Sequence, residues 1–270
     1  PTDIFLKIIT KLDIKCIFFI DCTYLLKLSK YKIKYDLLNE DYDLVVKQIN
    51  KLCSMGHYIY PHIHPHWIDA TYNEDKNQWN LSKIINYRFD SLNLNQQEKI
   101  FNQSVNILKE ILKESQSYKI EGYRAGGWCI QPFNNFHKLF IKNKINADFS
   151  VLPGSIADTN AWKFNFSSIS KNSKPYYFLD NESQPNKKGK FIEFPITSLK
   201  IKNNRVTDKL LDAFLWRTKY GRSIGDGCGV KVINYREASK NKFSNQICSI
   251  ENLTISRLHL YKEYLNSNNY

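Results

Sequence analysis

The strongest constraint on the fold is a regular alternation of amphipathic helical segments with short apolar segments across the first 150 residues. The first pair is a predicted helix over residues 2–11 followed by a predicted strand over residues 14–20. Alternating helices and strands predict a mainly parallel sheet, open or closed into a barrel. Three further pairs follow: 41–55 with 57–64, 95–112 (capped by Asn95 with Glu98) with 118–123, and 132–142 with 145–151.

The pattern is looser beyond Pro153, where aromatic residues alternate with Ser, Asn and Lys. Residues 184–190 have the composition of an exposed loop. The sequence contains no internal repeat, and we expect a single domain spanning residues 1–270. The remaining predicted elements are strands over 191–201, 230–235 and 246–250 and helices over 207–219 and 254–266.

Composition is that of a globular protein with a sizeable core. The chain has 270 residues, of which 42% are hydrophobic and 24% are charged. Its longest apolar run, residues 16–20, is far shorter than the roughly 20 residues that a membrane-spanning helix needs. We therefore expect no membrane span.

The net charge favours anionic partners in general. Thirty-nine Lys and Arg against 26 Asp and Glu give +13 at pH 7, which attracts polyanions by long-range steering. Lys far outnumbers Arg, however, and the lysines are dispersed, whereas nucleic-acid sites favour clustered arginine. We expect no nucleic-acid partner, and a basic nucleic-acid-binding protein is only our third hypothesis.

The cysteines indicate a reducing compartment. None of the six forms a CxxC pair, and Cys16 lies inside an apolar strand pattern, which is typical of reduced thiols. No export signal opens the sequence. These features together predict a cytoplasmic protein.

Four of the six histidines lie within ten residues, at the end of the predicted strand 57–64. Imidazole is a common metal ligand, and two or three such groups must converge to bind a divalent ion. His62 and His66 share a face if the chain turns helically, whereas His62 and His64 share one if the strand continues. We predict a divalent metal site, most simply zinc, on His62, His64 and His66. The alternative is a set of stacked surface histidines beside Trp67.

A second polar segment ends the next predicted strand. Arg124 can hold a carboxylate in a fixed orientation, and Gly126 and Gly127 can let a substrate approach the backbone. Trp128 can stack on a sugar ring, as can Trp67. Strand ends that face the same way open on one mouth of an αβ barrel. The alternative is a turn that carries a surface arginine.

These two segments together resemble the polysaccharide deacetylase family with the NodB-homology domain. The pattern His62-x-x-x-His66, followed by Tyr123-Arg124-Ala125-Gly126-Gly127-Trp128, is closest to the branch of bacterial surface-polysaccharide biosynthesis. The resemblance implies a distorted (β/α) barrel. It also implies that His62 and His66 bind a divalent metal and that Arg124 orients a catalytic carboxylate.

The chain departs from this family at both ends. The family's first strand, with paired aspartates, and its last strand, with a histidine, have no counterpart between Pro1 and Tyr270. We expect a fragment: a barrel without its first and last strands, whose open sheet edges lower solubility. Asp21 could replace the missing acidic ligand, but we favour a structural role in which it caps the turn with Thr23.

The resemblance implies a metal-dependent hydrolase that removes an N- or O-acetyl group from a sugar. A metal ion lowers the pKa of bound water toward ~7, and a carboxylate base takes the water's proton. The alternative is a non-catalytic member of the same fold that binds a glycan or a metal, because the acid–base residues of the family are not in this chain.

Overall fold

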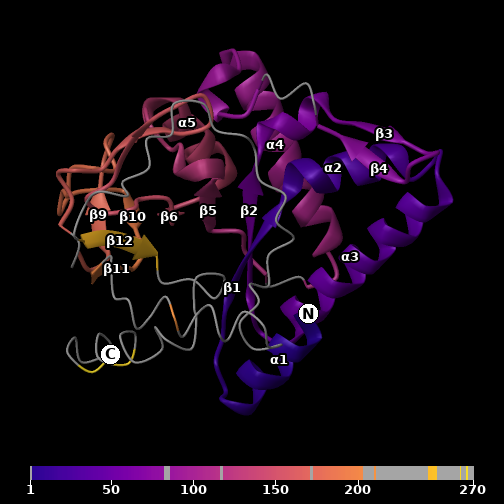
Figure 1. Ribbon diagram of the computed structural model, residues 1–270, viewed down its shortest axis with the longest axis horizontal. Coiled ribbons are helices and arrows are strands. Elements are labelled where there is room, and N and C mark those ends of the chain that lie inside the picture. Colours follow the sequence, from indigo (N-terminus) through magenta and orange to yellow (C-terminus); the bar gives the residue numbers. More distant parts are fainter. Residues whose placement is uncertain are drawn as a thin grey trace.

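The chain folds into an α/β structure built on a mainly parallel sheet (Figure 1). The computed structural model describes residues 2–81, 86–115, 118–170, 173–202 and 243–247, together with Leu210, Lys262 and Asn266. The predicted α/β class and parallel sheet are confirmed, and closure of the sheet into a barrel stays a prediction.

Five of the six strands in the main sheet run parallel, and only β9 is antiparallel to its neighbour. Among the described strands, β1 and β9 form the two edges. In spatial order the strands are β1 (Ile17–Asp21), β2 (Tyr58–Ile63), β5 (Gly122–Ala125), β6 (Ala147–Asp148), β10 (Phe191–Glu193) and β9 (Tyr176–Phe178).

Helices cover the face of this sheet that carries Tyr123. Its ring contacts Phe101 and Phe140, with ring centroids 5.0 and 5.6 Å apart, and all three side chains are fully buried. Large aromatic groups dominate the burial energy of such a core. The α-helices are α1 (Thr2–Lys11), α2 (Cys22–Tyr31), α3 (Asp36–Ser54), α4 (Leu94–Ile111) and α5 (Asn134–Asn143), and the 3₁₀ turns are η1 (Pro65–Asp69), η2 (Phe89–Ser91) and η3 (Gly126–Trp128).

The opposite face carries a row of aromatic rings. Phe19, Tyr60 and Phe149 come from three different strands or strand ends, and the Phe149 ring lies 5.3 Å from Phe19 and 6.0 Å from Tyr60. Gly122 lies against the Tyr60 and Phe149 rings, and a Cβ at this position would overlap both of them. The glycine at 122 is thus explained by ring packing.

Within the described residues, three two-stranded antiparallel sheets are separate from the main sheet. β3 (Thr71–Asn73) pairs with β4 (Gln78–Asn80), β7 (Ile156–Asp158) with β8 (Lys163–Asn165), and β11 (Ser198–Lys202) with β12 (Phe243–Ile247), all antiparallel. The predicted strand 191–201 is therefore wrong as one element. Its two ends belong to β10 and β11, which lie in different sheets.

Two predicted helix starts are also wrong. α4 begins after Asn93, whose side chain accepts from the Gln96 N–H while Gln96 caps the Asn93 N–H in return, so the capping box lies two residues before the expected Asn95 and Glu98. α3 begins at Asp36, not at 41.

The sequence analysis missed α2 entirely. The sequence pattern predicts no element for residues 22–31, between the predicted strand 14–20 and the predicted helix 41–55. In the structure Leu25 and Leu28 of this segment are fully buried in the core. Tertiary packing therefore stabilises a segment whose local pattern is weak. The predicted helices 207–219 and 254–266 and the strand 230–235 lie almost entirely outside the described residues, and 246–250 overlaps β12.

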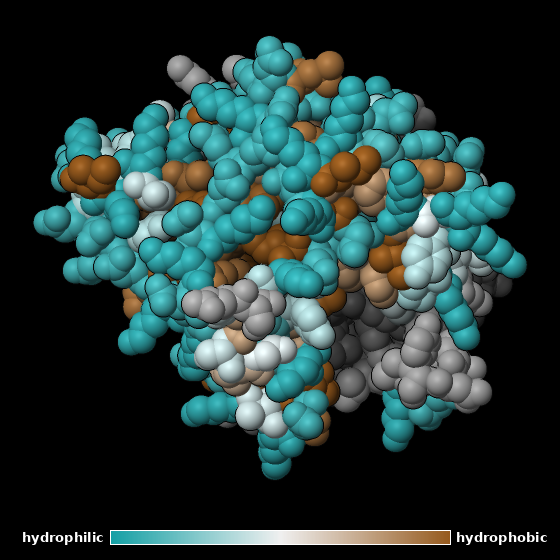
Figure 2. Space-filling model, turned by 180° about the vertical axis from the view of Figure 1, so that it is seen from behind, coloured by the Kyte–Doolittle hydropathy of each residue, from teal (hydrophilic) through white to brown (hydrophobic). Residues whose placement is uncertain are grey.

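Hydrophilic residues cover most of the face in Figure 2, with smaller apolar areas between them. In the described part of the chain, no helix is long and apolar enough to cross a membrane. Cys16, Cys22, Cys53 and Cys129 are free, as expected for these four thiols.

Two carboxyl groups, Asp148 and Glu193, are fully buried side by side on β6 and β10, where the two residues are paired in register. Ser150 Oγ donates to Asp148 at 2.7 Å and the Val151 N–H donates to Glu193 at 3.1 Å. Burial raises the pKa of both groups, and for Glu193 the charge of Asp148 raises it further. Because both groups are buried at paired positions, two negative charges there would be costly, and one of the two carboxyl groups therefore keeps a proton.

The raised pKa values of Asp148 and Glu193 predict that the free energy of unfolding depends on pH. The folded protein keeps a proton that the unfolded chain loses above pH ~4.3, so unfolding free energy should fall as pH rises, by up to about 1.4 kcal/mol per pH unit. Glu193→Gln keeps the size and polarity of the side chain but removes its titrating proton, so it should flatten this slope in urea denaturation at pH 5 to 8. The exposed control Glu110→Gln should leave the slope unchanged; an unchanged slope in Glu193→Gln contradicts a shared proton.

Candidate functional site

Three polar residues lie level at the carboxyl ends of neighbouring strands. Asp21 at the end of β1 is paired in register with His62 on β2, and His62 is paired with Arg124 on β5. Because strand residues alternate between the two faces of a sheet, side chains at these paired positions share one face. The parallel register therefore brings the two predicted segments together, as the sequence analysis expected.

Asp21 connects the end of β1 to the histidine segment. One carboxylate oxygen accepts from Thr23 Oγ1 at 2.7 Å and from the Tyr24 N–H at 3.2 Å, which caps α2. The other oxygen lies 3.0 Å from His64 Nδ1 and accepts from Trp67 Nε1 at 3.1 Å. The capping role predicted for Asp21 with Thr23 is confirmed.

The balance of forces on Asp21 favours its charged form. Burial opposes ionisation, but the hydrogen bonds from His64 and Thr23 and the charge of His64 outweigh burial and lower the pKa of Asp21. Asp21 is therefore a fixed negative charge beside the histidines.

His62 is held in one orientation by the strand beside it. Its Nδ1 lies 2.7 Å from the carbonyl oxygen of Arg124. A carbonyl only accepts, so Nδ1 carries the hydrogen and Nε2 keeps its lone pair. Burial, helped by the charge of His64, lowers the pKa of His62 to about 4, so the ring is neutral at physiological pH. A neutral, oriented imidazole is the form that binds metal.

The three imidazoles form a row with His64 in the middle. The His64 ring centroid lies 4.4 Å from that of His62 and 5.4 Å from that of His66. His66 stacks on Tyr87 at 5.1 Å with an interplanar angle of 16°. His66 is buried, and its Nδ1 has no hydrogen-bond partner among the described residues. Burial, with the charge of His64, lowers the pKa of His66 to about 4.

These residues fit part of a metal site. His66 has an unpartnered Nδ1, and His62 and His64 are each held through Nδ1, by the Arg124 carbonyl and by Asp21, which leaves the Nε2 lone pair of each ring. In the described part of the chain, no group of three or more His, Cys, Asp or Glu side chains is placed to hold a metal ion. Metal binding by His62, His64 and His66 stays a prediction.

Arg124 presents its charge to the aromatic row. The guanidinium carbon lies 5.5 Å from the centroid of the Phe19 ring, within the range of a cation–π contact. The side chain is half-buried on the same face as Asp21 and His62. Arg124 thus lies beside His62 at the carboxyl end of β5, and its role in orienting a catalytic carboxylate stays a prediction.

The two glycines after Arg124 are required by the protein's own packing. A Cβ on Gly126 would overlap the carbonyl oxygen of Ile63 and lie 2.7 Å from the His64 ring. Gly127 has φ +59°, and a Cβ there would lie 2.8 Å from Trp162. The structure thus gives these glycines a structural reason, where the sequence analysis expected substrate access.

The two predicted sugar-stacking tryptophans differ in their surroundings. Trp67 is held by Asp21 through its indole N–H and packs against Tyr24 at 4.7 Å. Trp128 is the last residue of η3, and its ring centroid lies 6.4 Å from that of Trp162 and 6.1 Å from that of Phe164. Both indoles are partly exposed, and sugar stacking stays a prediction for each.

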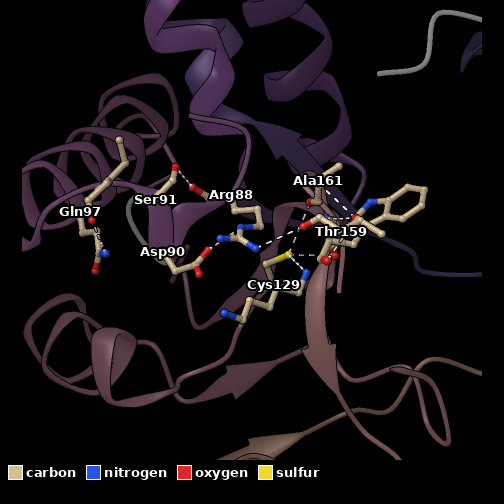
Figure 3. Close-up of polar contacts among 11 residues, drawn as sticks. Arg88, Asp90, Ser91, Gln97, Cys129, Thr159 and Ala161 are labelled. Carbon is tan, nitrogen blue, oxygen red and sulfur yellow. Dashed lines mark hydrogen bonds and ion pairs between the residues drawn. The ribbon is translucent and has the colours of Figure 1, made fainter. Parts of the chain in front are cut away.

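The sequence analysis missed the polar contacts next to Tyr87, the ring that stacks on His66. Arg88, which follows Tyr87, pairs with Asp90 at 3.1 Å and donates to the carbonyl of Thr159 at 3.3 Å (Figure 3). Cys129, shown beside them, accepts from the Lys163 N–H at 3.4 Å. These contacts join segments far apart in sequence, and no local motif marks them.

Comparisons with known protein families, with curated proteins and with solved structures found no match to this chain.

The hydrogen bonds of Asp21 make a stability prediction. Asp21→Ala removes a helix cap, worth about 1 kcal/mol, and leaves the partly buried donors of His64 and Trp67 without their acceptor, worth about 2 kcal/mol more. Asn93→Ala is a matched control, because it removes only the cap of α4. We expect Asp21→Ala to lower the unfolding free energy in urea by clearly more than Asn93→Ala. Equal losses contradict the role of Asp21 in holding the histidine segment.

Proposed function

We propose that this chain carries the histidine and arginine groups of a metal-dependent hydrolase that removes an acetyl group from a carbohydrate. The proposal is supported by one observation above all: Asp21, His62 and Arg124 lie level on three parallel strands, with His64 and His66 beside them. Ligand sites in parallel α/β sheets characteristically form at the carboxyl ends of the strands.

His62 and His66 are the residues that would hold the metal, as the family resemblance implies: the contact of His62 Nδ1 with the Arg124 carbonyl leaves its Nε2 lone pair, and His66 Nδ1 has no hydrogen-bond partner among the described residues. A divalent ion, zinc in our proposal, would polarise the acetyl carbonyl and make water more acidic. The Arg124 carbonyl keeps the His62 ring oriented for this task. Asp21 does the same for His64 through a 3.0 Å contact.

The general base is a carboxylate that we assign to another part of the protein. Asp21 is tied to Thr23, Tyr24, His64 and Trp67, and moving it would uncap α2. Arg124 is placed on the same face as His62, where a guanidinium can hold such a carboxylate ionised. Catalysis by this scheme requires that base and a third metal ligand.

The substrate we propose is an acetylated sugar of a bacterial surface polysaccharide, modified in the cytoplasm. Trp67 and Trp128 lie after the ends of β2 and β5, on the segments that carry the polar groups. Indole rings in such positions offer flat apolar faces to sugar rings.

A second candidate function is glycan or metal binding without turnover. It is favoured by the engagement of both Asp21 oxygens in hydrogen bonds, because a carboxylate held in this way is not available as a catalytic base.

The histidine pair provides the test. We expect the protein to bind Zn²⁺ in isothermal titration, and His62→Ala/His66→Ala to weaken that binding at least about 100-fold. Acetate release from N-acetylglucosamine oligomers by the whole protein should be lost in the same variant. His137→Ala is the matched control, because His137 lies on α5 beside Asp180 and Phe191.

The outcomes separate the two candidates. Loss of zinc binding together with loss of acetate release supports the hydrolase. Zinc or glycan binding without any acetate release by the whole protein supports the binding protein. Zinc binding that survives in His62→Ala/His66→Ala overturns the assignment of these two ligands.

A further inference from the structure

A cavity of about 460 Å³ lies between α2, α4 and η1, next to the histidine segment. α2 and α4 lie side by side (Figure 1). The cavity is lined by the lysines Lys27, Lys30 and Lys99, the glutamines Gln96 and Gln103, and the indole of Trp67.

The charge on this lining is of one sign. Three lysines contribute to it, and none of the described residues that line it is acidic. Lys27 is partly buried and donates to the Ala70 carbonyl at 3.0 Å, which uses one of its three ammonium hydrogens. Burial and the charge of Lys30 lower the pKa of Lys27, against a smaller opposing effect of Asp69. The folded protein thus gathers positive charges that an anion would stabilise.

The rest of the lining suits a carbohydrate. Side-chain amides such as Gln96 and Gln103 donate to and accept from hydroxyl groups. Trp67 and Ile68 give the cavity an apolar side. Lysine is a compact point charge with rotatable donors, which suits a carboxylate or a phosphate without demanding a planar, two-point geometry.

The cavity is connected to the candidate site through two side chains, those of Trp67 and Thr23. Trp67 lines the cavity and also donates its indole N–H to Asp21, which contacts His64. Thr23 also lines the cavity and donates a hydrogen bond to Asp21. A ligand in the cavity therefore lies one side chain away from the histidine row.

We propose that this lysine cavity binds the anionic group of an acidic sugar, a carboxylate or a phosphate, in a carbohydrate that extends toward the histidines. The substrate class would then be an acidic rather than a neutral glycan. The inference rests on the proposed function for the identity of the ligand as a sugar, but its binding test needs neither metal nor turnover.

The experiment compares four probes with the protein at low and physiological salt, by isothermal titration. They are a tetrasaccharide of alternating glucuronate and N-acetylglucosamine, N-acetylglucosamine 6-phosphate, a neutral N-acetylglucosamine tetramer and a short single-stranded DNA. We expect an acidic sugar to bind at least tenfold more tightly than the neutral tetramer, and the preferred acidic probe identifies the anion. The proposal is overturned if neither acidic sugar binds more tightly than the neutral tetramer. It is also overturned if the DNA binds more tightly than the acidic sugars.

Two triple variants separate a site from a general charge effect. Lys27→Gln/Lys30→Gln/Lys99→Gln should weaken acidic-sugar binding at least tenfold and leave neutral-sugar binding unchanged. The control Lys11→Gln/Lys47→Gln/Lys187→Gln removes the same charge at exposed lysines elsewhere and should bind like the parent protein. Equal losses in both variants overturn the proposal, because they show long-range attraction alone. Thermal melting verifies that both variants are folded.

The same probes distinguish this inference from the proposed function. His62→Ala/His66→Ala should keep its affinity for the acidic sugar, because those rings do not line the cavity. If acidic-sugar binding is present and depends on the three lysines while no zinc is bound, the cavity assignment holds and the hydrolase assignment fails. If zinc is bound and acetate released without preference for an acidic sugar, the reverse is true.

Discussion

The carboxylate of Asp21 is the interaction on which the candidate site depends. It terminates β1, caps α2, contacts His64 and accepts from the indole of Trp67, so β1, α2 and the segment from His64 to Trp67 meet at two oxygen atoms. Hydrogen bonds to a charged acceptor are stronger than neutral ones, and leaving their donors without a partner is costly. Burial works against this charge, and the hydrogen bonds outweigh it. The arrangement of the histidines is therefore tied to the folding of α2.

The parallel sheet decides which residues meet. Register places Asp21, His62 and Arg124 side by side, and alternation puts the aromatic row of Phe19, Tyr60 and Phe149 on the same face. The opposite face is covered by helices and contains Tyr123 with the carboxyl pair on β6 and β10. Polar side chains therefore lie on both faces of the sheet, but the histidine row adjoins only the face that carries Asp21, His62 and Arg124. The buried carboxyl pair belongs to the core, and its cost in stability depends on pH.

Charge adds a second level of organisation. A net charge of +13 spread over the chain favours any polyanion, but a cavity that gathers three lysines beside Trp67 adds shape and position to that attraction. The indole of Trp67 and the side chain of Ile68 also give this cavity an apolar side, which a diffuse positive charge does not provide. The side chains of Thr23 and Trp67 join this cavity to Asp21, so recognition of an anion and the geometry of the histidines share the same supporting residues.

The sequence by itself determined the α/β class, the histidine and arginine segments and the capping role of Asp21, because periodicity, residue chemistry and short-range hydrogen bonds are local properties. Only the tertiary structure decided that α2 is a helix, that 191–201 divides between two sheets, and that Gly126 is needed where the chain passes His64. Only in the tertiary structure does Tyr87 stack on His66, and only there do Lys27 and Lys99 line the same cavity. These contacts join residues distant along the chain, and their formation depends on burial and register, which no local pattern encodes.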